Sequence, residues 1–218
     1  MEKEKIDQKI NISIQLDHGL VRNNPQNPKR IILLLHGYKL NGEFLYDTFI
    51  KIMPEDSLVI APNGPFIVPV IKKESFSAGY AWYFFDPMKK HFYINYDPAA
   101  EYLKKMMQEL NPNKLPITII GYSQGGYLAP KVAEICPNVK SVIGVNCVFR
   151  STKFTFKPEI QYHQIHGEID LIVEPQGAEE EFNKLQTLGN TGSFTLLPEE
   201  GHKLSPRFMD PVAKCLNS

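Results

Sequence analysis

The sequence predicts an α/β fold in which a mainly parallel central sheet is covered by helices on both faces. Apolar runs of strand length alternate along the chain with segments of helical pattern, an arrangement typical of parallel sheets. The runs are apolar on both sides, so we expect the strands to be buried on both faces. With 218 residues, 43% of them hydrophobic, the chain can enclose one sizeable core, and we expect a single domain over residues 1–218.

The expected elements follow from these runs in chain order. The predicted strands are Arg30–Leu35, Ser57–Ala61, Pro116–Ile120, Ser141–Asn146, Ile160–Ile165 and Ser193–Leu197, with Ile10–Leu16 a candidate for an antiparallel edge strand. The predicted helices are Gly42–Met53, Pro98–Leu110, Gly125–Ile135, Gln176–Leu188 and Pro206–Leu216. The helix after Asp97 has the clearest pattern, with Asp97 expected as its N-cap and Pro98 in its first turn.

The stretch Asn63–Tyr96 breaks this rhythm, because it is rich in aromatic residues and has no clear period. Long irregular connections in compact domains are usually functional, and aromatic side chains commonly line ligand pockets. The stretch leaves the carboxyl end of a predicted strand, where ligands bind in open parallel sheets. We therefore predict that Trp82, Phe84 and Phe85, together with Tyr38 of an earlier loop, bind the substrate. The alternative is that the aromatics of this stretch form a satellite core.

The most specific motif is Gly121-Tyr122-Ser123-Gln124-Gly125, which lies between a predicted strand and a predicted helix. A strand, a Gly-x-Ser-x-Gly turn and a helix in that order form a nucleophile elbow, in which a tight turn lifts the serine oxygen clear of the sheet. The motif predicts that Ser123 is the nucleophile of a serine hydrolase. The alternative is an ordinary turn serine.

A serine hydroxyl needs a general base and an acid that orients the base, and on this type of scaffold they follow in the order serine, acid, histidine. Asp170 follows the strand Ile160–Ile165, and His202 follows the last predicted strand. We predict Asp170 as the acid and His202 as the base, with Glu168 as a rival acid in the same loop. Because the base must be neutral to accept a proton, hydrolysis is expected to rise with pH.

Acyl transfer also needs donors for the negative oxygen of the tetrahedral intermediate. The backbone N–H of Gln124 lies at the predicted helix N-terminus, whose dipole favours negative charge. The N–H of Tyr38 is the expected second donor, because Gly37 allows the backbone of the preceding loop to turn inward. The motif histidines His36 and His166 are predicted to be buried and hydrogen-bonded to loop backbone.

Composition excludes several function classes. Lys and Arg number 24 and so do Asp and Glu, and no basic stretch interleaves with aromatics, so nucleic acid is not an expected partner. No run approaches the ~18 apolar residues of a membrane span, and the charged start has no secretory pattern. Three scattered cysteines favour neither disulfides nor zinc. We expect a cytoplasmic protein without stable membrane insertion, metal or organic cofactor, and the sequence leaves its oligomeric state open.

Several motifs together resemble the carboxylesterase/acyl-protein thioesterase (phospholipase/carboxylesterase) family of small α/β-hydrolases over about residues 30–205. They are Leu35-His36-Gly37, Gly121-Tyr122-Ser123-Gln124-Gly125-Gly126, His166-Gly167-x-x-Asp170 and Gly201-His202, and Ala81-Trp82-Tyr83 is similar to that family's Ala-Trp-Phe segment. The resemblance implies an α/β-hydrolase fold without a large cap domain. It also implies the triad and oxyanion donors named above.

The function predicted is hydrolysis of short-to-medium acyl carboxylic esters or thioesters through an acyl-enzyme, with a small-molecule ester or an acylated molecule as substrate. A serine peptidase of the same fold is one alternative. A catalytically silent ligand-binding protein is another, because fold does not fix function. A lipase acting at a membrane surface is a third, since the apolar patch Phe66–Lys73 ends in a charge pair.

Overall fold

The computed structural model describes residues 19–72, 75–86, 88–89 and 91–217. Within them, seven strands form a sheet in the order β1-β3-β2-β8-β9-β10-β11. The strands are β1 (Leu20–Arg22), β2 (Arg30–Leu35), β3 (Ser57–Pro62), β8 (Ile117–Tyr122), β9 (Val139–Val145), β10 (Gln161–Gly167) and β11 (Phe194–Leu197). Only β1 is antiparallel to its neighbour among these strands, which confirms the mainly parallel sheet. The candidate edge strand Ile10–Leu16 lies outside the described residues.

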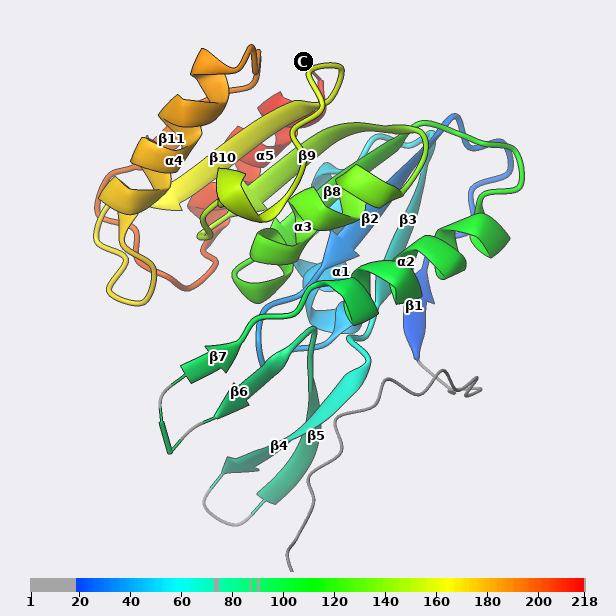
Figure 1. The fold of residues 1–218 in the computed structure, drawn as a ribbon. Coiled ribbons are helices and arrows are strands. Elements are labelled where there is room, and N and C mark those ends of the chain that lie inside the picture. The colour runs from blue at the N-terminus through cyan, green and yellow to red at the C-terminus, as the bar shows by residue number, and fades with distance from the viewer. Residues whose placement is uncertain (1–18, 73–74, 87, 90, 218) are drawn as a thin grey trace, which may run out of the picture.

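Helices cover both faces of this sheet (Figure 1). They are α1 (Gly42–Phe49), α2 (Asp97–Leu110), α3 (Gln124–Ile135), α4 (Pro175–Thr187) and α5 (Met209–Leu216), with short 3₁₀ turns η1 (Ile50–Ile52), η2 (Ser151–Lys153) and η3 (Pro206–Phe208). Helices α2, α3 and α4 pack on one face, and α1 and α5 pack on the other. The two-sided cover explains why the strands carry continuous apolar runs rather than an alternating pattern.

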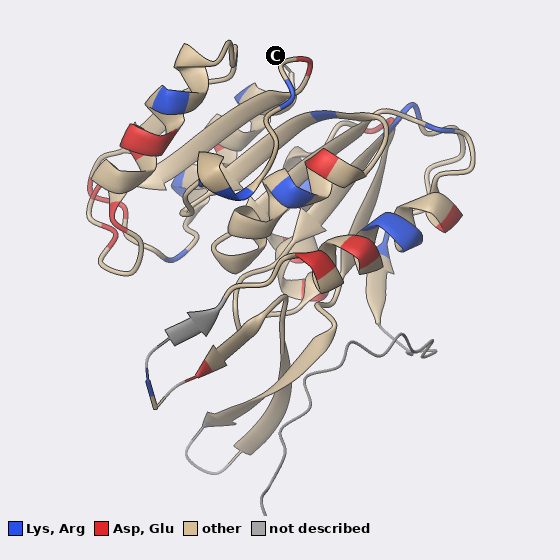
Figure 2. Cartoon of the chain, viewed as in Figure 1, with Lys and Arg blue, Asp and Glu red and all other residues tan. Residues whose placement is uncertain are grey.

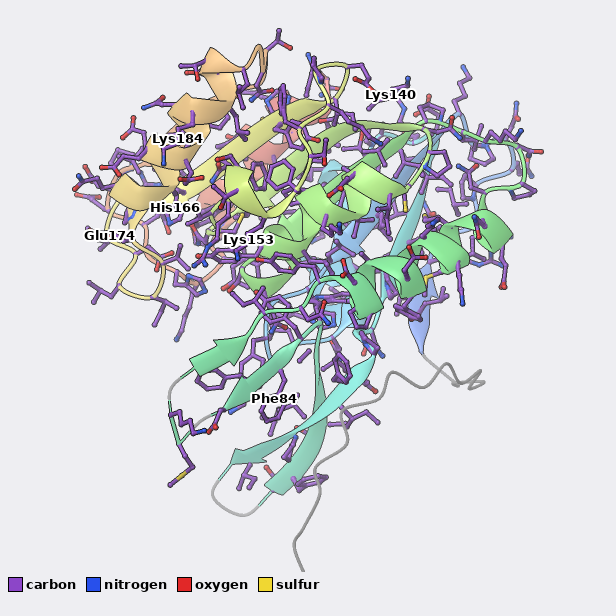
Figure 3. All side chains as sticks on the ribbon, in the orientation of Figure 1. Phe84, Lys140, Lys153, His166, Glu174 and Lys184 are labelled. Atoms are coloured by element: carbon purple, nitrogen blue, oxygen red, sulfur yellow. The ribbon has the colours of Figure 1, made fainter. Side chains whose placement is uncertain are left out.

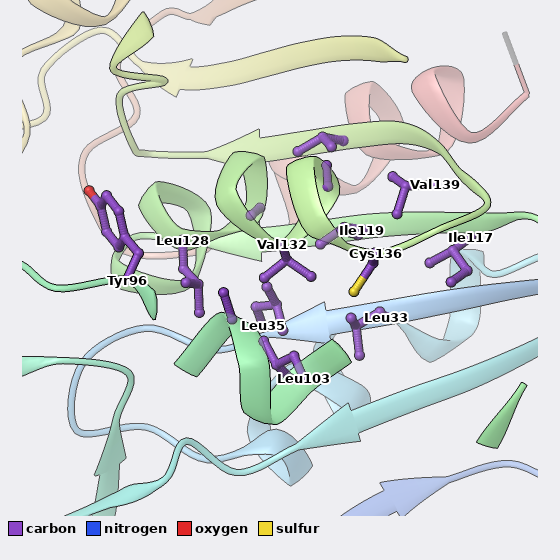
Figure 4. Packing of buried hydrophobic residues seen from close by; sticks show 14 of the residues in the cluster. Leu33, Leu35, Tyr96, Leu103, Ile117, Ile119, Leu128, Val132, Cys136 and Val139 are labelled. Atoms are coloured by element: carbon purple, nitrogen blue, oxygen red, sulfur yellow. The ribbon is translucent and has the colours of Figure 1, made fainter. Parts of the chain in front are cut away.

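Strand β2 shows how the sequence divides between the two cores. Leu33 and Leu35 pack toward α2 and α3, and Figure 4 shows them beside side chains of those helices. Ile32 and Leu34 point the other way and pack with residues of α1 and α5. All four side chains are fully buried, as expected because successive residues of a strand face opposite sides of the sheet.

The predicted start of the second helix is wrong by one residue. Helix α2 begins at Asp97, and Tyr96 in the cap position already has helical angles, φ −78° and ψ −23°. Asp97 therefore lies in the first turn, where its charge still suits the helix dipole. The side chain of Asn95 accepts the hydrogen bond from the Asp97 N–H at 3.1 Å, which is the capping role expected for Asp97.

The stretch Asn63–Tyr96 is not irregular, as the sequence suggested, but forms two antiparallel hairpins. The first pairs β4 (Phe66–Lys72) with β5 (Ser75–Ala81), and the second pairs β6 (Phe84–Asp86) with β7 (His91–Tyr93). Pro69 lies within β4, because a two-stranded hairpin leaves one edge of each strand unpaired and proline is tolerated there. Both hairpins project beyond one end of the parallel sheet (Figure 1). The described chain forms no separate cap domain.

Candidate active site

Ser123 lies in the sharp turn between β8 and α3 with φ 49° and ψ −118°, a left-handed conformation that is unusual for a residue with a side chain. Both glycines of the motif are needed for this turn. A Cβ on Gly121 would lie 2.5 Å from the Gly125 carbonyl oxygen, and a Cβ on Gly125 would lie 2.1 Å from the Leu35 carbonyl oxygen. The glycines therefore let α3 approach β8 and β2 closely while the turn carries the serine.

Two of the predicted partners meet Ser123 at the carboxyl edge of the sheet. His202, in the loop after β11, places Nε2 3.0 Å from Ser123 Oγ. Its Nδ1 lies 2.8 Å from Oδ2 of Asp170, which follows β10. The rival Glu168 is exposed, and its carboxylate accepts a hydrogen bond from the Glu199 N–H instead. The structure thus joins Ser123, His202 and Asp170 in one hydrogen-bonded chain.

The carboxylate of Asp170 is buried and heavily hydrogen-bonded. Its Oδ1 accepts from the N–H groups of Ile172 and Val173, at 2.8 and 3.0 Å. Burial on its own raises the pKa of Asp170, but hydrogen bonds from His166, His202 and these two N–H groups outweigh it and hold the pKa well below its ordinary value. Asp170 is therefore a fixed negative charge facing His202.

Sequence analysis missed the second histidine on this carboxylate. His166 is fully buried, and its Nε2 lies 3.3 Å from Asp170 Oδ2 and 2.9 Å from the Val173 carbonyl oxygen. The contact with loop backbone confirms the burial predicted for His166. The four-residue spacing between His166 and Asp170 was the available signal. It runs from the end of β10 into the following loop, so it does not fix which side chains meet.

Asn146 is a second residue that the sequence did not reveal. It is fully buried at the end of β9, with φ 49°. Its Nδ2 donates to the carbonyl oxygens of Gly201 and His202 at 3.2 and 2.7 Å, and its Oδ1 accepts from the Gly167 N–H at 2.9 Å. Asn146 therefore joins the loop of the histidine to the strand end that leads to Asp170.

His36 is buried and bonded to backbone, as predicted. The Gly64 N–H donates to its Nε2 at 2.8 Å, so Nδ1 carries the proton and donates to the Gly37 carbonyl oxygen at 2.7 Å. Burial lowers the pKa of His36 to about 4, against a smaller opposing effect of the Gly37 bond. His36 is thus a neutral structural link between the loop after β2 and the first hairpin.

Trp82 is fully buried in the core rather than at a cavity wall. Its indole N–H donates to the His36 carbonyl oxygen at 2.8 Å, and its ring packs against the His36 ring with centroids 4.8 Å apart. The side chain of Gln124 holds the same segment, accepting from the Trp82 N–H at 2.9 Å and donating to the Tyr83 carbonyl oxygen at 3.0 Å. The predicted lining role of Trp82 therefore conflicts with where the fold places its ring.

Two neighbouring cavities open at this edge. The small cavity, of about 260 Å³, is lined by Tyr38, Tyr83, Ile94, Ser123, Gln124, Tyr127, Arg150, Ile172 and Val173. The large cavity, of about 610 Å³, is lined by Tyr38, Lys39, Pro65, Phe66, Ile67, Val68, Pro69, Ala81, Tyr83, Phe84 and Phe85. Tyr38 and Tyr83 border both cavities. Phe84, labelled in Figure 3, lies among the side chains of the hairpins.

The two expected oxyanion donors border the small cavity together with Ser123. Gln124 is the first residue of α3, and N–H groups in the first turn of a helix have no partner within the helix. Tyr38 lies in the loop that the Lys39 N–H ties to the Tyr80 carbonyl oxygen at 2.9 Å. Burial raises the pKa of the Tyr38 phenol, so this side chain is neutral.

The described residues hold no group of three or more His, Cys, Asp or Glu side chains placed to bind a metal ion. In the same part of the chain, no helix has the length and apolar character to cross a membrane.

Known proteins resemble this chain in sequence and fold. The family model described as phospholipase/carboxylesterase matches residues 16–218. Esterase PE8 is 22% identical, with a TM-score of 0.75, and the match covers 94% of this chain and 99% of that protein. Zea mays acyl-protein thioesterase 2 is 20% identical, with a TM-score of 0.72, and the match covers 91% of this chain and 97% of that protein. Arabidopsis thaliana SOBER1 is 19% identical with a TM-score of 0.65 over 86% and 98%. No curated protein matches the sequence. The chain belongs to the phospholipase/carboxylesterase family and has the α/β-hydrolase fold.

Proposed function

We propose that this protein is a serine hydrolase that cleaves short-to-medium acyl carboxylic esters or thioesters through an acyl-enzyme. The observation that carries the proposal is the hydrogen-bonded chain from Ser123 through His202 to Asp170, which borders a cavity at the carboxyl edge of the sheet. Membership of the phospholipase/carboxylesterase family supports the same reaction class.

In the first half of the proposed reaction, Ser123 Oγ attacks the carbonyl carbon of the substrate while His202 Nε2 takes its proton. Asp170 accepts the hydrogen bond from His202 Nδ1–H, which leaves Nε2 free of a proton and aimed at the serine. His202 then gives the proton to the departing alcohol or thiol. In the second half, water attacks the acyl-Ser123 ester by the same proton transfers in reverse.

The tetrahedral intermediates place a negative charge on the former carbonyl oxygen. The N–H groups of Tyr38 and Gln124 are proposed as its donors, since both residues border the small cavity with Ser123. Losing one such donor typically raises the barrier by ~3–4 kcal/mol. The N-terminus of α3 adds a favourable dipole at the same place.

The large cavity is proposed to hold the apolar part of the substrate. Tyr38, Phe84 and Phe85 contribute to its wall, and the Tyr38 and Phe85 rings pack edge to face with centroids 5.4 Å apart. Its volume of about 610 Å³ corresponds to roughly 20 waters, which is enough for a medium-length acyl chain. Trp82 has no place in this wall, because its ring is buried in the core.

A fluorophosphonate probe tests the nucleophile. Such probes phosphonylate a serine only where a base activates it, so wild type should be labelled at Ser123 and Ser123→Ala should not. The Ser123→Ala protein should also lose roughly 10⁴-fold in kcat on p-nitrophenyl acetate with unchanged Tm. An unlabelled wild type would support a silent ligand-binding protein. Cleavage of peptide amides as fast as matched esters would support a peptidase.

A lipase working at a lipid surface is a second candidate, because the first hairpin exposes large apolar side chains. Ile67, Ile71 and Phe76 are 68%, 78% and 73% exposed. Hydrolysis of tributyrin would then rise sharply once it forms droplets, and Ile71→Ser with Phe76→Ser would abolish the rise. Leu188→Ser, at an exposed site at the C-terminal end of α4, is the matched control. A rate that levels off at the solubility limit excludes this candidate.

A further inference from the structure

Arg150 is an exposed residue that lines the same cavity as the nucleophile but has no part in the reaction described above. It follows the carboxyl end of β9 and lines the small cavity together with Ser123. Its guanidinium carbon lies 5.5 Å from the centre of the Tyr127 ring. Tyr127 is one helical turn beyond Ser123 on α3, and its N–H donates to the Ser123 carbonyl oxygen at 3.1 Å. The charge of Arg150 is therefore anchored over the first turn of the nucleophile's helix.

This charge is not neutralised by the described residues. Arg150 is the one charged residue among those that line the small cavity, and Lys39 is the one that lines the large cavity. No ion pair of the described residues includes Arg150. The nearby carboxylate of Asp170 is enclosed by two histidines and two N–H groups. Both cavities thus present positive charge and no described acidic side chain to a ligand.

The positive charge of Arg150 acts on the pKa of the neighbouring tyrosines Tyr96 and Tyr127. Burial raises the pKa of Tyr96 to about 12, and the charge of Arg150 opposes that rise. Burial likewise raises the pKa of Tyr127, while both the charge of Arg150 and a hydrogen bond with it act in the opposite direction. Both phenols stay neutral, so neither supplies a counter-charge to Arg150.

We propose that Arg150 binds a carboxylate of the substrate in the small cavity, so that the preferred substrates are esters or thioesters carrying a carboxylate a few bonds from the carbonyl that Ser123 attacks. The inference rests on the proposed function. A planar guanidinium pairs with a carboxylate through two parallel hydrogen bonds. The cavity, with room for about nine waters, suits a short polar segment better than a long chain.

Charge matching favours a carboxylate over a phosphate. A phosphate monoester carries about −1.5 to −2 charges at neutral pH, and the described lining of the small cavity supplies a single cation. A carboxylate carries one negative charge and balances Arg150. A charge-assisted pair of this kind is expected to raise kcat/KM roughly 10- to 100-fold over an uncharged substrate of the same shape.

The experiment compares matched substrates that differ only in the charged group. On the acyl side, monomethyl adipate is compared with its primary amide, methyl adipamate. On the leaving-group side, 3-acetoxybenzoate is compared with 3-acetoxybenzamide, and 3-acetoxyphenyl phosphate is added as the phosphate arm. The quantity measured is the ratio of kcat/KM for the carboxylate to that for the amide, which cancels any general loss of activity.

We expect a ratio of at least ~10 in one arm for wild type. Arg150→Gln, which keeps most of the side-chain stem over Tyr127, should bring the ratio to about one, and Arg150→Lys should retain part of it. Lys153→Gln is the control, since Lys153, labelled in Figure 3, is exposed on η2 and does not line the cavity. It removes the same charge and should leave the ratio unchanged.

A wild-type ratio near one in both arms would overturn the inference, as would a ratio that Arg150→Gln does not lower. An equal loss in Lys153→Gln would show general attraction of anions rather than a site at Arg150. A preference for the phosphate over the carboxylate would overturn the choice of anion. If no substrate is cleaved and no fluorophosphonate label appears, the proposed function fails as well. If Ser123 is labelled and both amides are cleaved as fast as the carboxylates, only the inference about Arg150 is refuted.

Discussion

The loops that carry Ser123, Asp170 and His202 are tied to the ends of buried strands, whereas the hairpins β4–β5 and β6–β7 reach beyond the sheet and expose apolar side chains. In the first region, Asn146 and His166 are fully buried and hydrogen-bonded to neighbouring loops. In the second, β4 and β5 carry almost no Lys, Arg, Asp or Glu in the part that Figure 2 colours. Ser123 lines the small cavity, Phe66 and Phe84 of the hairpins line the large cavity, and Tyr38 and Tyr83 line both.

If the proposed function holds, this contrast predicts that the reaction and the selection of substrates depend on separate parts of the chain. Hydrogen bonds between loops set the positions of reacting atoms, so changes there should alter kcat for every substrate. Apolar contacts on the hairpins set how much of an acyl chain is buried, so changes there should alter the order of preference among substrates.

The largest effect is expected at the acid. Asp170→Asn should lower kcat by about 10⁴-fold on every ester, because an amide at this position favours the wrong tautomer of His202. Glu168→Gln is the matched control, since Glu168 lies in the same loop but bonds the Glu199 N–H. It should change kcat by less than about threefold. Steady-state kinetics on p-nitrophenyl acetate and octanoate measure both, and the reverse order of severity would identify Glu168 as the acid.

Asn146→Ala should have the next largest effect, about 100-fold in kcat with little change in KM, because it releases the His202 loop. Asn190→Ala is the control. Asn190 is also buried, and its side chain bonds both the N–H and the carbonyl oxygen of Tyr162, far from Ser123 in the sheet. Asn190→Ala should lower Tm about as much as Asn146→Ala does, but it should leave kcat unchanged. Equal losses of kcat in the two variants would mean that Asn146 is merely structural.

Substitutions in the hairpins should change which acyl-chain length is preferred rather than the rate on every ester. Each methylene buried contributes ~0.8 kcal/mol, so kcat/KM should climb up to several-fold per added CH₂ from acetate to octanoate. Phe84→Ala should flatten this climb and spare acetate, because Phe84 lines the large cavity. Phe76→Ala, which removes an exposed ring of β5 outside the cavity lining, should leave the climb intact. Loss of activity on acetate in Phe84→Ala would contradict the division.

The smallest effect concerns acid stability. The folded-state pKa of Asp170 lies below its ordinary value of 3.8, so the ionised carboxyl stabilises the fold above that pH, and the stabilisation is lost as pH falls from 3.8 through the folded value. The Tm difference between wild type and Asp170→Asn should therefore shrink below pH 3.8. Thermal denaturation followed from neutral pH to about pH 3 tests this, and a constant difference would refute it.

The sequence predicted the parts of the fold that depend on local pattern. The apolar runs predicted the strands, and Gly121 and Gly125 predicted the elbow because the turn leaves no room for a Cβ at either position. The hairpins escaped prediction, since the aromatic residues of this stretch showed no clear period. The burial of Trp82 depends on bonds to His36 and Gln124, which are distant in the sequence, so its local aromatic run gave no sign of it.

The proposed acyl-enzyme is tested most directly by trapping it. Wild type is mixed with p-nitrophenyl trimethylacetate, whose bulky acyl group slows hydrolysis of the intermediate, then quenched in acid, digested and analysed by mass spectrometry. We expect a stoichiometric burst of p-nitrophenolate and one trimethylacetyl group on Ser123, both absent in Ser123→Ala. An acyl group on a different residue, or steady turnover with neither burst nor acylated Ser123, would contradict it.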